Sequence, residues 1–198
     1  MISMQKIVLA TNNPHKSEEI RAILKDLPFK ILTASDFPDF PDPDETGATL
    51  EENARLKAVA IHRATGLWAL ADDSGLEVDA LDGAPGVISA RFAGEECTFA
   101  DNNRKLLDLM MDVPDSHRGA RFRCVAALAK STADVTLFSG EVCGVITREI
   151  HGDGGFGYDP VFYVPELGCT FAEATSEAKN LISHRGRAFR QVAEFIGR

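Results

Sequence analysis

Hydrophobic residues follow two patterns that alternate along the chain. One pattern predicts strands and the other predicts helices. Short segments rich in apolar residues predict strands at residues 6–10, 31–32, 67–71, 121–129, 135–146 and 161–164. Apolar residues at helical spacing occupy residues 17–27, the segment after Thr49, residues 98–113 and the C-terminal segment. Strands interleaved with helices are typical of an α/β fold. The last two long strands are joined by a short turn, which predicts that part of the sheet is antiparallel.

A long polar stretch precedes the second predicted helix. Residues 34–48 are rich in proline and aspartate and show no periodic pattern. A loop of this length inside a compact domain is often functional. Thr49 and Glu52 have the spacing of a capping box, which predicts that the helix begins there.

The composition is that of an ordinary globular domain. The chain has 198 residues, of which 44% are hydrophobic and 26% are charged, and we expect residues 1–198 to form a single domain. The net charge of −9 argues against a nucleic-acid polymer as partner, because such binding needs a basic stripe. It leaves open a small anionic ligand held in a local basic pocket.

The cysteines and the N-terminal residues predict a cytoplasmic protein. Cys97, Cys124, Cys143 and Cys169 show no CxxC spacing, which argues against a zinc knuckle or redox pair and favours reduced thiols. The sequence begins without a long apolar segment of the signal-peptide type, and no apolar stretch approaches the length of a membrane-spanning helix. We therefore expect no membrane partner.

The first candidate binding segment is a polar loop between the first predicted strand and helix. It consists of Thr11, Asn12, Asn13, Pro14, His15 and Lys16. The start of a helix presents backbone N–H groups that bind anions, and Lys16 adds a positive charge. The chain contains no GxxxxGK[ST] pattern, so this is not a Walker A loop. The alternative to phosphate binding is an ordinary turn between a strand and a helix.

Acidic residues form the second candidate site. Asp72 and Asp73 follow a predicted buried strand, and Glu45 lies in the long polar loop. Neighbouring side chains of a strand point to opposite faces, so at most one of the two aspartates faces a cleft unless the chain turns at Ser74 and Gly75. Carboxylate oxygens suit Mg²⁺, which typically takes one or two carboxylates together with phosphates and water. A solvated Asp-Asp turn is the alternative.

The third candidate is the glycine-rich segment of residues 151–160. Its glycines match the GxGxxG pattern, but the dinucleotide-binding fingerprint must open a helix, and Pro160 favours extended geometry at Asp159. We interpret the segment as a loop that lets the backbone approach a ligand closely. Phe156 could stack on a base there, and Asp159 adds a carboxylate. A tight glycine turn is the alternative.

The fourth candidate combines Lys179 with the segment that opens the last helix. Ser183 is a candidate N-cap, which places His184 and Arg185 in the first helical turn. Cations at a helix N-terminus oppose the helix dipole, and a bound ligand would account for this cost. Surface residues without a role are the alternative.

Taken together, these segments resemble the inosine triphosphate pyrophosphatase family, and its bacterial branch most. The matching segments, in order, are LATNNPHK (9–16), ETG (45–47), ENA and KA (52–54, 57–58), ADDSGL (71–76), GAPG and SAR (83–86, 89–91), GGFGYDP (154–160) and SHRG (183–186). Members hydrolyse inosine, deoxyinosine and xanthosine triphosphates to the monophosphate and pyrophosphate. The resemblance implies an elongated, twisted mixed β-sheet with flanking helices, two lobes around a central cleft, and a homodimer.

The resemblance also implies a role for each matched residue. Asp73 would act as the general base, and Glu45 and Asp73 would hold Mg²⁺, with Asp72 beside them. The loop from Thr11 to Lys16 would hold the triphosphate, and Ser74 would contact the substrate. The base pocket would consist of Phe156, Gly157, Tyr158, Asp159, Lys179, His184 and Arg185.

Two other functions remain open at this point. The first is a pyrophosphatase for other modified nucleotides, such as methylated pyrimidines, which a profile of base preference would separate. The second is a nucleotide-binding sensor without turnover, against which the carboxylates Glu45 and Asp73 argue.

Overall fold

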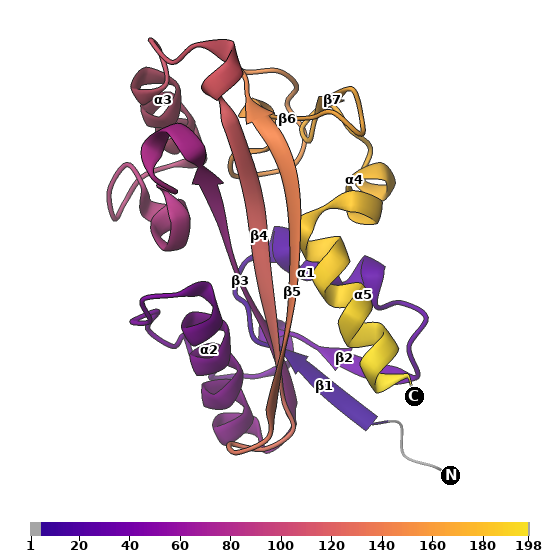
Figure 1. Cartoon of the computed structure of the whole chain (residues 1–198). Coiled ribbons are helices and arrows are strands. Elements are labelled where there is room, and N and C mark those ends of the chain that lie inside the picture. The colour runs from indigo at the N-terminus through magenta and orange to yellow at the C-terminus, as the bar shows by residue number, and fades with distance from the viewer. Residues whose placement is uncertain (1–4, 198) are drawn as a thin grey trace. The chain divides into compact units, whose positions relative to one another are not determined.

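The strands of the computed structural model, which describes residues 5–197, form one mixed sheet (Figure 1). Its strands are β1 Gln5–Leu9, β2 Phe29–Leu32, β3 Trp68–Val78, β4 Gly119–Ala129, β5 Val135–Ile146, β6 Phe162–Val164 and β7 Cys169–Thr170. Their order in the sheet is β2-β1-β3-β4-β5-β6-β7. Strand β1 pairs in parallel with β2 and β3, whereas β6 pairs antiparallel with β5 and β7. The expected α/β fold with a mixed sheet is confirmed.

The helices flank this sheet. They are α1 Pro14–Ile23, α2 Leu50–Thr65, α3 Phe99–Leu109, α4 Ser176–Ile182 and α5 His184–Ile196. Helix α3 is shorter than the predicted residues 98–113, and Thr98 caps it through a capping box with Asp101. Helix α5 begins at His184, as the sequence predicts, but the separate helix α4 in front of it was not predicted.

Helix α1 begins before the predicted residue 17 because Asn13 caps it. The Asn13 side-chain oxygen accepts a hydrogen bond from the backbone N–H of Lys16 at 3.2 Å. Pro14 opens the helix, where its missing N–H group costs nothing and its fixed φ is already helical. The polar loop is therefore shorter than expected, and His15 and Lys16 lie in the first helical turn.

Helix α2 begins after Thr49 as predicted, but its capping box is only half formed. The Thr49 hydroxyl oxygen accepts from the Glu52 N–H at 3.1 Å. The Glu52 carboxylate accepts from the Ala48 N–H at 2.6 Å instead of from Thr49. Gly66, at φ 68°, ends the helix in the left-handed conformation that glycine adopts most easily.

Strand β3 differs most from its prediction. We expected a strand over residues 67–71 that ended at Asp72 and Asp73, with a possible turn at Ser74 and Gly75. The strand instead runs without interruption to Val78. Gly75 is required by close packing and not by a turn, because a Cβ atom at this position would lie 2.4 Å from the backbone oxygen of Gly86.

The chain divides into two compact units, which are described separately. The first consists of Met1–Asp73, Cys124–Gly140 and Arg185–Arg198, and the second of Ser74–Arg123 and Glu141–His184. In the first unit, α2 lies on one side of β1 and β3, and α1 and α5 lie on the other side (Figure 1). The single domain and the cleft expected between two lobes stay predictions.

Each unit has its own hydrophobic core. In the first unit the core residues on the α1 and α5 side include Ile7, Leu9, Ile20, Leu70, Phe189 and Val192. In the second unit they include Leu76, Val78, Leu106, Phe122, Phe162 and Phe171. Asp72 and Asp73 immediately precede the point along β3 where the chain passes from the first unit to the second.

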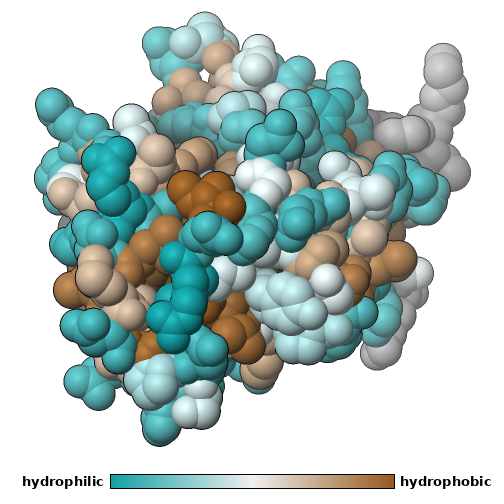
Figure 2. Space-filling view, turned by 90° about the horizontal axis from the view of Figure 1, so that it is seen from above, coloured by the Kyte–Doolittle hydropathy of each residue, from teal (hydrophilic) through white to brown (hydrophobic). Residues whose placement is uncertain are grey.

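Hydrophobic residues on the surface are scattered. On the face shown in Figure 2, hydrophobic residues lie in separate groups between hydrophilic ones. Within residues 5–197, no helix has both the length and the apolar character that crossing a membrane would require.

Candidate active site

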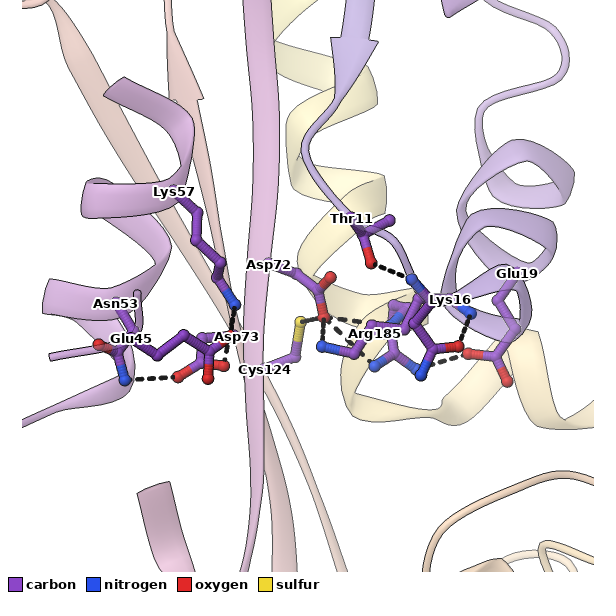
Figure 3. A network of polar contacts seen from close by, with 11 residues as sticks. Thr11, Lys16, Glu19, Glu45, Asn53, Lys57, Asp72, Asp73, Cys124 and Arg185 are labelled. Atoms are coloured by element: carbon purple, nitrogen blue, oxygen red, sulfur yellow. Dashed lines mark hydrogen bonds and ion pairs between the residues drawn. The ribbon is translucent and has the colours of Figure 1, made fainter. Parts of the chain in front are cut away.

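Strand β3 places its two adjacent aspartates on opposite faces of the sheet. Figure 3 shows Asp73 directed toward α2, whereas Asp72 is directed toward α1 and α5. Both are buried, with exposed fractions of 1% for Asp72 and 5% for Asp73. The alternation follows from the regular strand, in which neighbouring side chains point to opposite sides. The alternation expected of a regular strand is therefore present, and the prediction that at most one aspartate faces a cleft stays a prediction.

Asp73 lies in a cluster of polar side chains from α2 and the long polar loop. Its carboxylate accepts hydrogen bonds from Lys57 Nζ at 3.1 Å and from Asn53 Nδ2 at 3.2 Å. Lys57 Nζ also lies 2.7 Å from a carboxylate oxygen of Glu45. Two carboxylates from distant segments therefore meet at one buried ammonium group (Figure 3).

The charges in this cluster change the acidity of its members. Burial raises the pKa of Asp73 above its ordinary value, and repulsion by Glu45 adds to this effect, although Lys57 acts in the opposite direction. Burial would lower the pKa of Lys57, but the carboxylates of Asp73, Asp72 and Glu45 outweigh it and raise that pKa. Lys57 therefore stays protonated, while Asp73 becomes a stronger base than an exposed aspartate.

The Glu45 and Asp73 oxygens fit a magnesium ion in their chemistry. Both are hard carboxylate ligands, both contact the same ammonium group, and the Glu45 side chain is 34% exposed. Within residues 5–197, no three or more His, Cys, Asp or Glu side chains gather as a metal site. Mg²⁺ usually takes one or two carboxylates from a protein and keeps water and substrate phosphates as its other ligands.

Asp72 belongs to a second charge cluster, on the opposite face. One of its carboxylate oxygens lies 3.2 Å from Lys16 Nζ and 3.2 Å from Arg185 Nη2. Arg185 Nη1 lies 2.5 Å from a carboxylate oxygen of Glu19, one turn after Lys16 on α1. This cluster ties the start of α1 to β3 and to the start of α5 (Figure 3).

Arg185 is deeply buried in this cluster. Its exposed fraction is 2%. Burial alone would lower its pKa, but the carboxylates of Asp72 and Glu19 outweigh that effect and raise it. Removing one member of a buried ion pair typically costs about 3–5 kcal/mol, because the other charge is left uncompensated. These contacts give Arg185 a structural role in the first unit. The base-pocket role that the resemblance implies for it stays a prediction.

The polar loop before α1 is ordered by its own side chains. The Thr11 hydroxyl oxygen accepts from the Asn13 N–H at 3.1 Å, and the exposed Asn12 donates to Asp42 at 3.0 Å. Lys16, with 18% of its side chain exposed, stands at the end of this loop. The loop therefore presents a helix start and a partly accessible ammonium group, both of which suit a phosphate.

The second unit holds most of the predicted base-pocket residues. The Asp159 carboxylate accepts from the Phe156 N–H at 2.8 Å and from Lys179 Nζ at 2.5 Å. Lys179 Nζ also lies 4.8 Å from the centre of the Phe156 ring. Phe156, Asp159 and Lys179 thus form one connected group, although α4, which carries Lys179, was not predicted.

As expected, the glycine-rich segment of residues 151–160 does not open an α-helix. It leads into a short 3₁₀ helix, Asp159–Val161, so the extended geometry expected at Asp159 was wrong. The carboxylate of Asp159 caps the preceding Phe156 N–H, which favours the turn over an extended backbone. Tyr158 is buried, and its hydroxyl donates to the Ser89 carbonyl at 2.9 Å.

The remaining predicted residues lie in the second unit as well. The imidazole of His184 stacks on Phe122 with ring centres 4.7 Å apart and is buried. Ser74 continues β3 directly after Asp73 and is partly exposed.

Sequence reasoning gave no role to Lys57, Asn53 or Glu19. Lys57 and Asn53 lie on the buried face of α2 with Ala54 and Ala58. A buried lysine needs a partner. A lysine and an asparagine at helical positions that face the core were therefore the signal of a polar cluster in the sequence.

A family comparison places the whole chain among known proteins. Residues 7–195 match the model of the Ham1 family. A dITP/XTP pyrophosphatase of Desulforamulus reducens is 52% identical over 98% of this chain and 96% of its own length. One of Geobacter sulfurreducens is 53% identical over 98% of both chains.

Solved structures of Ham1 proteins are similar to this chain over nearly its full length. A HAM1 protein from Coxiella burnetii superposes with a TM-score of 0.90 at 44% identity, over 98% of this chain and 99% of that one. The Ham1 protein of Staphylococcus aureus superposes with a TM-score of 0.86 at 41% identity, over 98% of both chains. The chain belongs to the Ham1 family.

Proposed function

We propose that this protein hydrolyses non-standard purine nucleoside triphosphates, namely ITP, dITP and XTP, to the monophosphate and pyrophosphate. The observation that carries the proposal is the near full-length similarity to proteins named dITP/XTP pyrophosphatase. The carboxylate pair of Glu45 and Asp73 supports it, because a protein that only sensed nucleotides would not need a buried base.

The residues of the first unit would divide the chemistry between them. Glu45 and Asp73 would hold Mg²⁺, which when bound neutralises charge on the phosphates. Lys16 and the N-terminus of α1 would bind the triphosphate. Asp73 would accept a proton from the attacking water, which is the role of a general base. Lys57 would hold the two carboxylates together.

Residues of the second unit would bind the base. Phe156 would stack on it, and Lys179 would donate to the oxygen at C6. The homodimer that the resemblance implies stays a prediction, and so does the cytoplasmic location that the cysteines and the N-terminal residues predict. The competing proposal of a pyrophosphatase for modified pyrimidines has no specific support in the site.

A pyrophosphate-release panel tests the function. ITP, dITP, XTP, GTP, ATP and a methylated pyrimidine triphosphate are each mixed with the protein and Mg²⁺, and the products are separated by chromatography. We expect the monophosphate and pyrophosphate from ITP, dITP and XTP. Turnover of the pyrimidine alone would favour the competing proposal, and binding without any turnover would indicate a sensor.

Activity should depend on Mg²⁺ and not on Zn²⁺. The proposed ligands are carboxylate oxygens, which suit a hard cation. Pyrophosphate release from ITP is measured in excess chelator and again after Mg²⁺ is restored, with a separate sample given Zn²⁺. We expect no release in chelator and full recovery with Mg²⁺. Full activity in chelator would exclude a metal role for Glu45 and Asp73.

A further inference from the structure

Helix α3 carries two adjacent buried asparagines that serve different partners. Asn102 and Asn103 have exposed fractions of 2% and 4%. Asn102 donates from Nδ2 to the Ala90 carbonyl at 3.0 Å, and its Oδ1 accepts from the Ala93 N–H at 2.7 Å. Both ends of this amide therefore hold one nearby segment of the same unit.

Asn103 reaches a different part of the second unit. Its Nδ2 donates to the backbone carbonyl of Gly157 at 2.9 Å, across 54 positions of sequence. Gly157 has a φ of 64°, in the region that favours glycine, and stands between Phe156 and Tyr158. The Asn103 amide thus holds the peptide group between Gly157 and Tyr158, one residue beyond the proposed base-stacking residue.

A second residue of α3 contacts the same loop. Phe99 lies one helical turn before Asn103, on the same side of the helix. Its ring centre is 6.1 Å from that of Phe156. The α3 helix therefore supports the loop at Phe156 through Phe99 and at Gly157 through Asn103.

The two ends of the Asn103 amide differ in their hydrogen bonding. Its Oδ1 is buried and has no hydrogen-bond partner within residues 5–197. A buried polar atom without a partner costs about 1–3 kcal/mol. The Nδ2 of Asn103 therefore makes the hydrogen bond described for this side chain, and its acceptor lies in the loop that carries Phe156.

We propose that Asn103 is a positioning residue for base recognition, which acts through Gly157 on Phe156 without touching the base. This inference rests on the proposed function, because it assigns the loop to base binding. It predicts that loss of the Asn103 donor weakens nucleotide binding and leaves the phosphate chemistry of the first unit intact.

The neighbouring asparagine provides a matched control. Asn103→Asp and Asn102→Asp each remove one Nδ2 donor to a backbone carbonyl, at 2.9 Å and 3.0 Å respectively, and add the same acidic group. A lost hydrogen bond of this kind is worth about 0.5–1.5 kcal/mol, or roughly 2- to 13-fold in affinity. We expect Asn103→Asp to raise KM for ITP by about 5- to 10-fold with kcat within about twofold, and Asn102→Asp to change neither.

Thermal unfolding of Asn103→Asp and Asn102→Asp shows whether a change in KM accompanies a loss of stability. Equal shifts of KM in the two variants, or an unchanged KM in Asn103→Asp, would overturn the proposal. So would a kcat loss in Asn103→Asp without a KM change. Asn103→Leu, which removes the donor without adding charge, must reproduce the KM shift. If Asn103→Asp and Asn103→Leu both fail to fold while Asn102→Asp folds, the role of Asn103 is structural and the proposal is wrong.

Failure of the proposed function is recognised separately. Wild-type protein that releases no pyrophosphate from ITP, dITP or XTP contradicts the function, whatever the variants do. The variant pair is then compared on the triphosphate that the wild type does hydrolyse, and the same KM split decides the positioning role.

Discussion

Asp73→Asn is expected to lower kcat for ITP by about 10²–10⁴-fold, the usual contribution of a positioned general base. Asparagine cannot accept the proton of an attacking water as a carboxylate does, and it is a poorer metal ligand. Its Oδ1 can still accept from Lys57. Its amide nitrogen would face Asn53 Nδ2, whose own Oδ1 is held by the Gly47 N–H at 2.7 Å. A modest loss of stability should therefore accompany the loss of activity.

Single-turnover pyrophosphate release measures this effect, and thermal unfolding of the same sample provides the control for folding. Asp72→Asn is the informative comparison, because the same substitution on the opposite face removes a partner of Lys16 and Arg185. That variant should lose more stability than Asp73→Asn. A folded Asp73→Asn protein with more than about a tenth of wild-type kcat, well outside the expected range, would show that Asp73 is not the base.

Wild-type protein should strongly prefer ITP to ATP. Inosine has an oxygen at C6, which only accepts hydrogen bonds, whereas adenine has an amino group there, which donates. Lys179 and Arg185 offer donors and no acceptors, so the amino group of adenine would find no acceptor on these two side chains. A site built to bond one group can reject an analogue that lacks it by about 10⁴–10⁵-fold, and solvent access makes this an upper bound. Guanine shares the C6 oxygen, so this argument does not exclude it.

The test compares kcat/KM for ITP and ATP in the wild type and in Lys179→Met. We expect the variant to lose most of the preference. Lys105→Met is a control for loss of a lysine over a phenylalanine ring, because Lys105 Nζ lies 4.4 Å from the centre of Phe92 and donates to a backbone carbonyl. It should keep the preference. Lys179 also pairs with the buried Asp159 carboxylate, so the Lys179→Met ratio is measured on the folded fraction. Equal hydrolysis of ATP and ITP by the wild type would refute the assigned pocket chemistry.

Arg185→Ala is a less direct test of base reading than the resemblance suggests. The substitution leaves Asp72 and Glu19 without the guanidinium group between them. A fall in stability is therefore expected whether or not Arg185 reads the base. Only a change in the ITP to ATP ratio, measured on the folded fraction, assigns Arg185 to the pocket.

The sequence predicted the order of the elements because apolar periodicity reflects burial, and burial determines the sheet and its helices. It failed where polar residues lie inside an element. The aspartates of β3 look like the end of a strand, yet hydrogen bonds and ion pairs compensate their burial, so the strand continues. Pro14 looks like a helix breaker, but at the first helical position it is harmless.

The candidate site was predicted unevenly for a related reason. Motif spacing singled out the polar loop of residues 11–16, the carboxylates and the glycine-rich segment, since each is a local pattern. Glu19 and Asn103 have no local pattern, because their partners lie 166 and 54 positions away, and the core-facing position of Lys57 does not reveal its partner Glu45. Only the folded chain shows which distant carboxylate or carbonyl each of them serves.

Because Asp72 and Asp73 point to opposite faces of β3, the sequence just before them cannot gain or lose one residue without consequence. Insertion or deletion of one residue between Leu70, which pairs with Leu9 of β1, and Asp72 would exchange the faces of every side chain that follows. Asp73 would then point toward α1 and α5, away from Lys57 and Glu45. Substitutions along β3 can be tolerated one at a time, but a single-codon insertion or deletion there would disrupt both charge clusters at once.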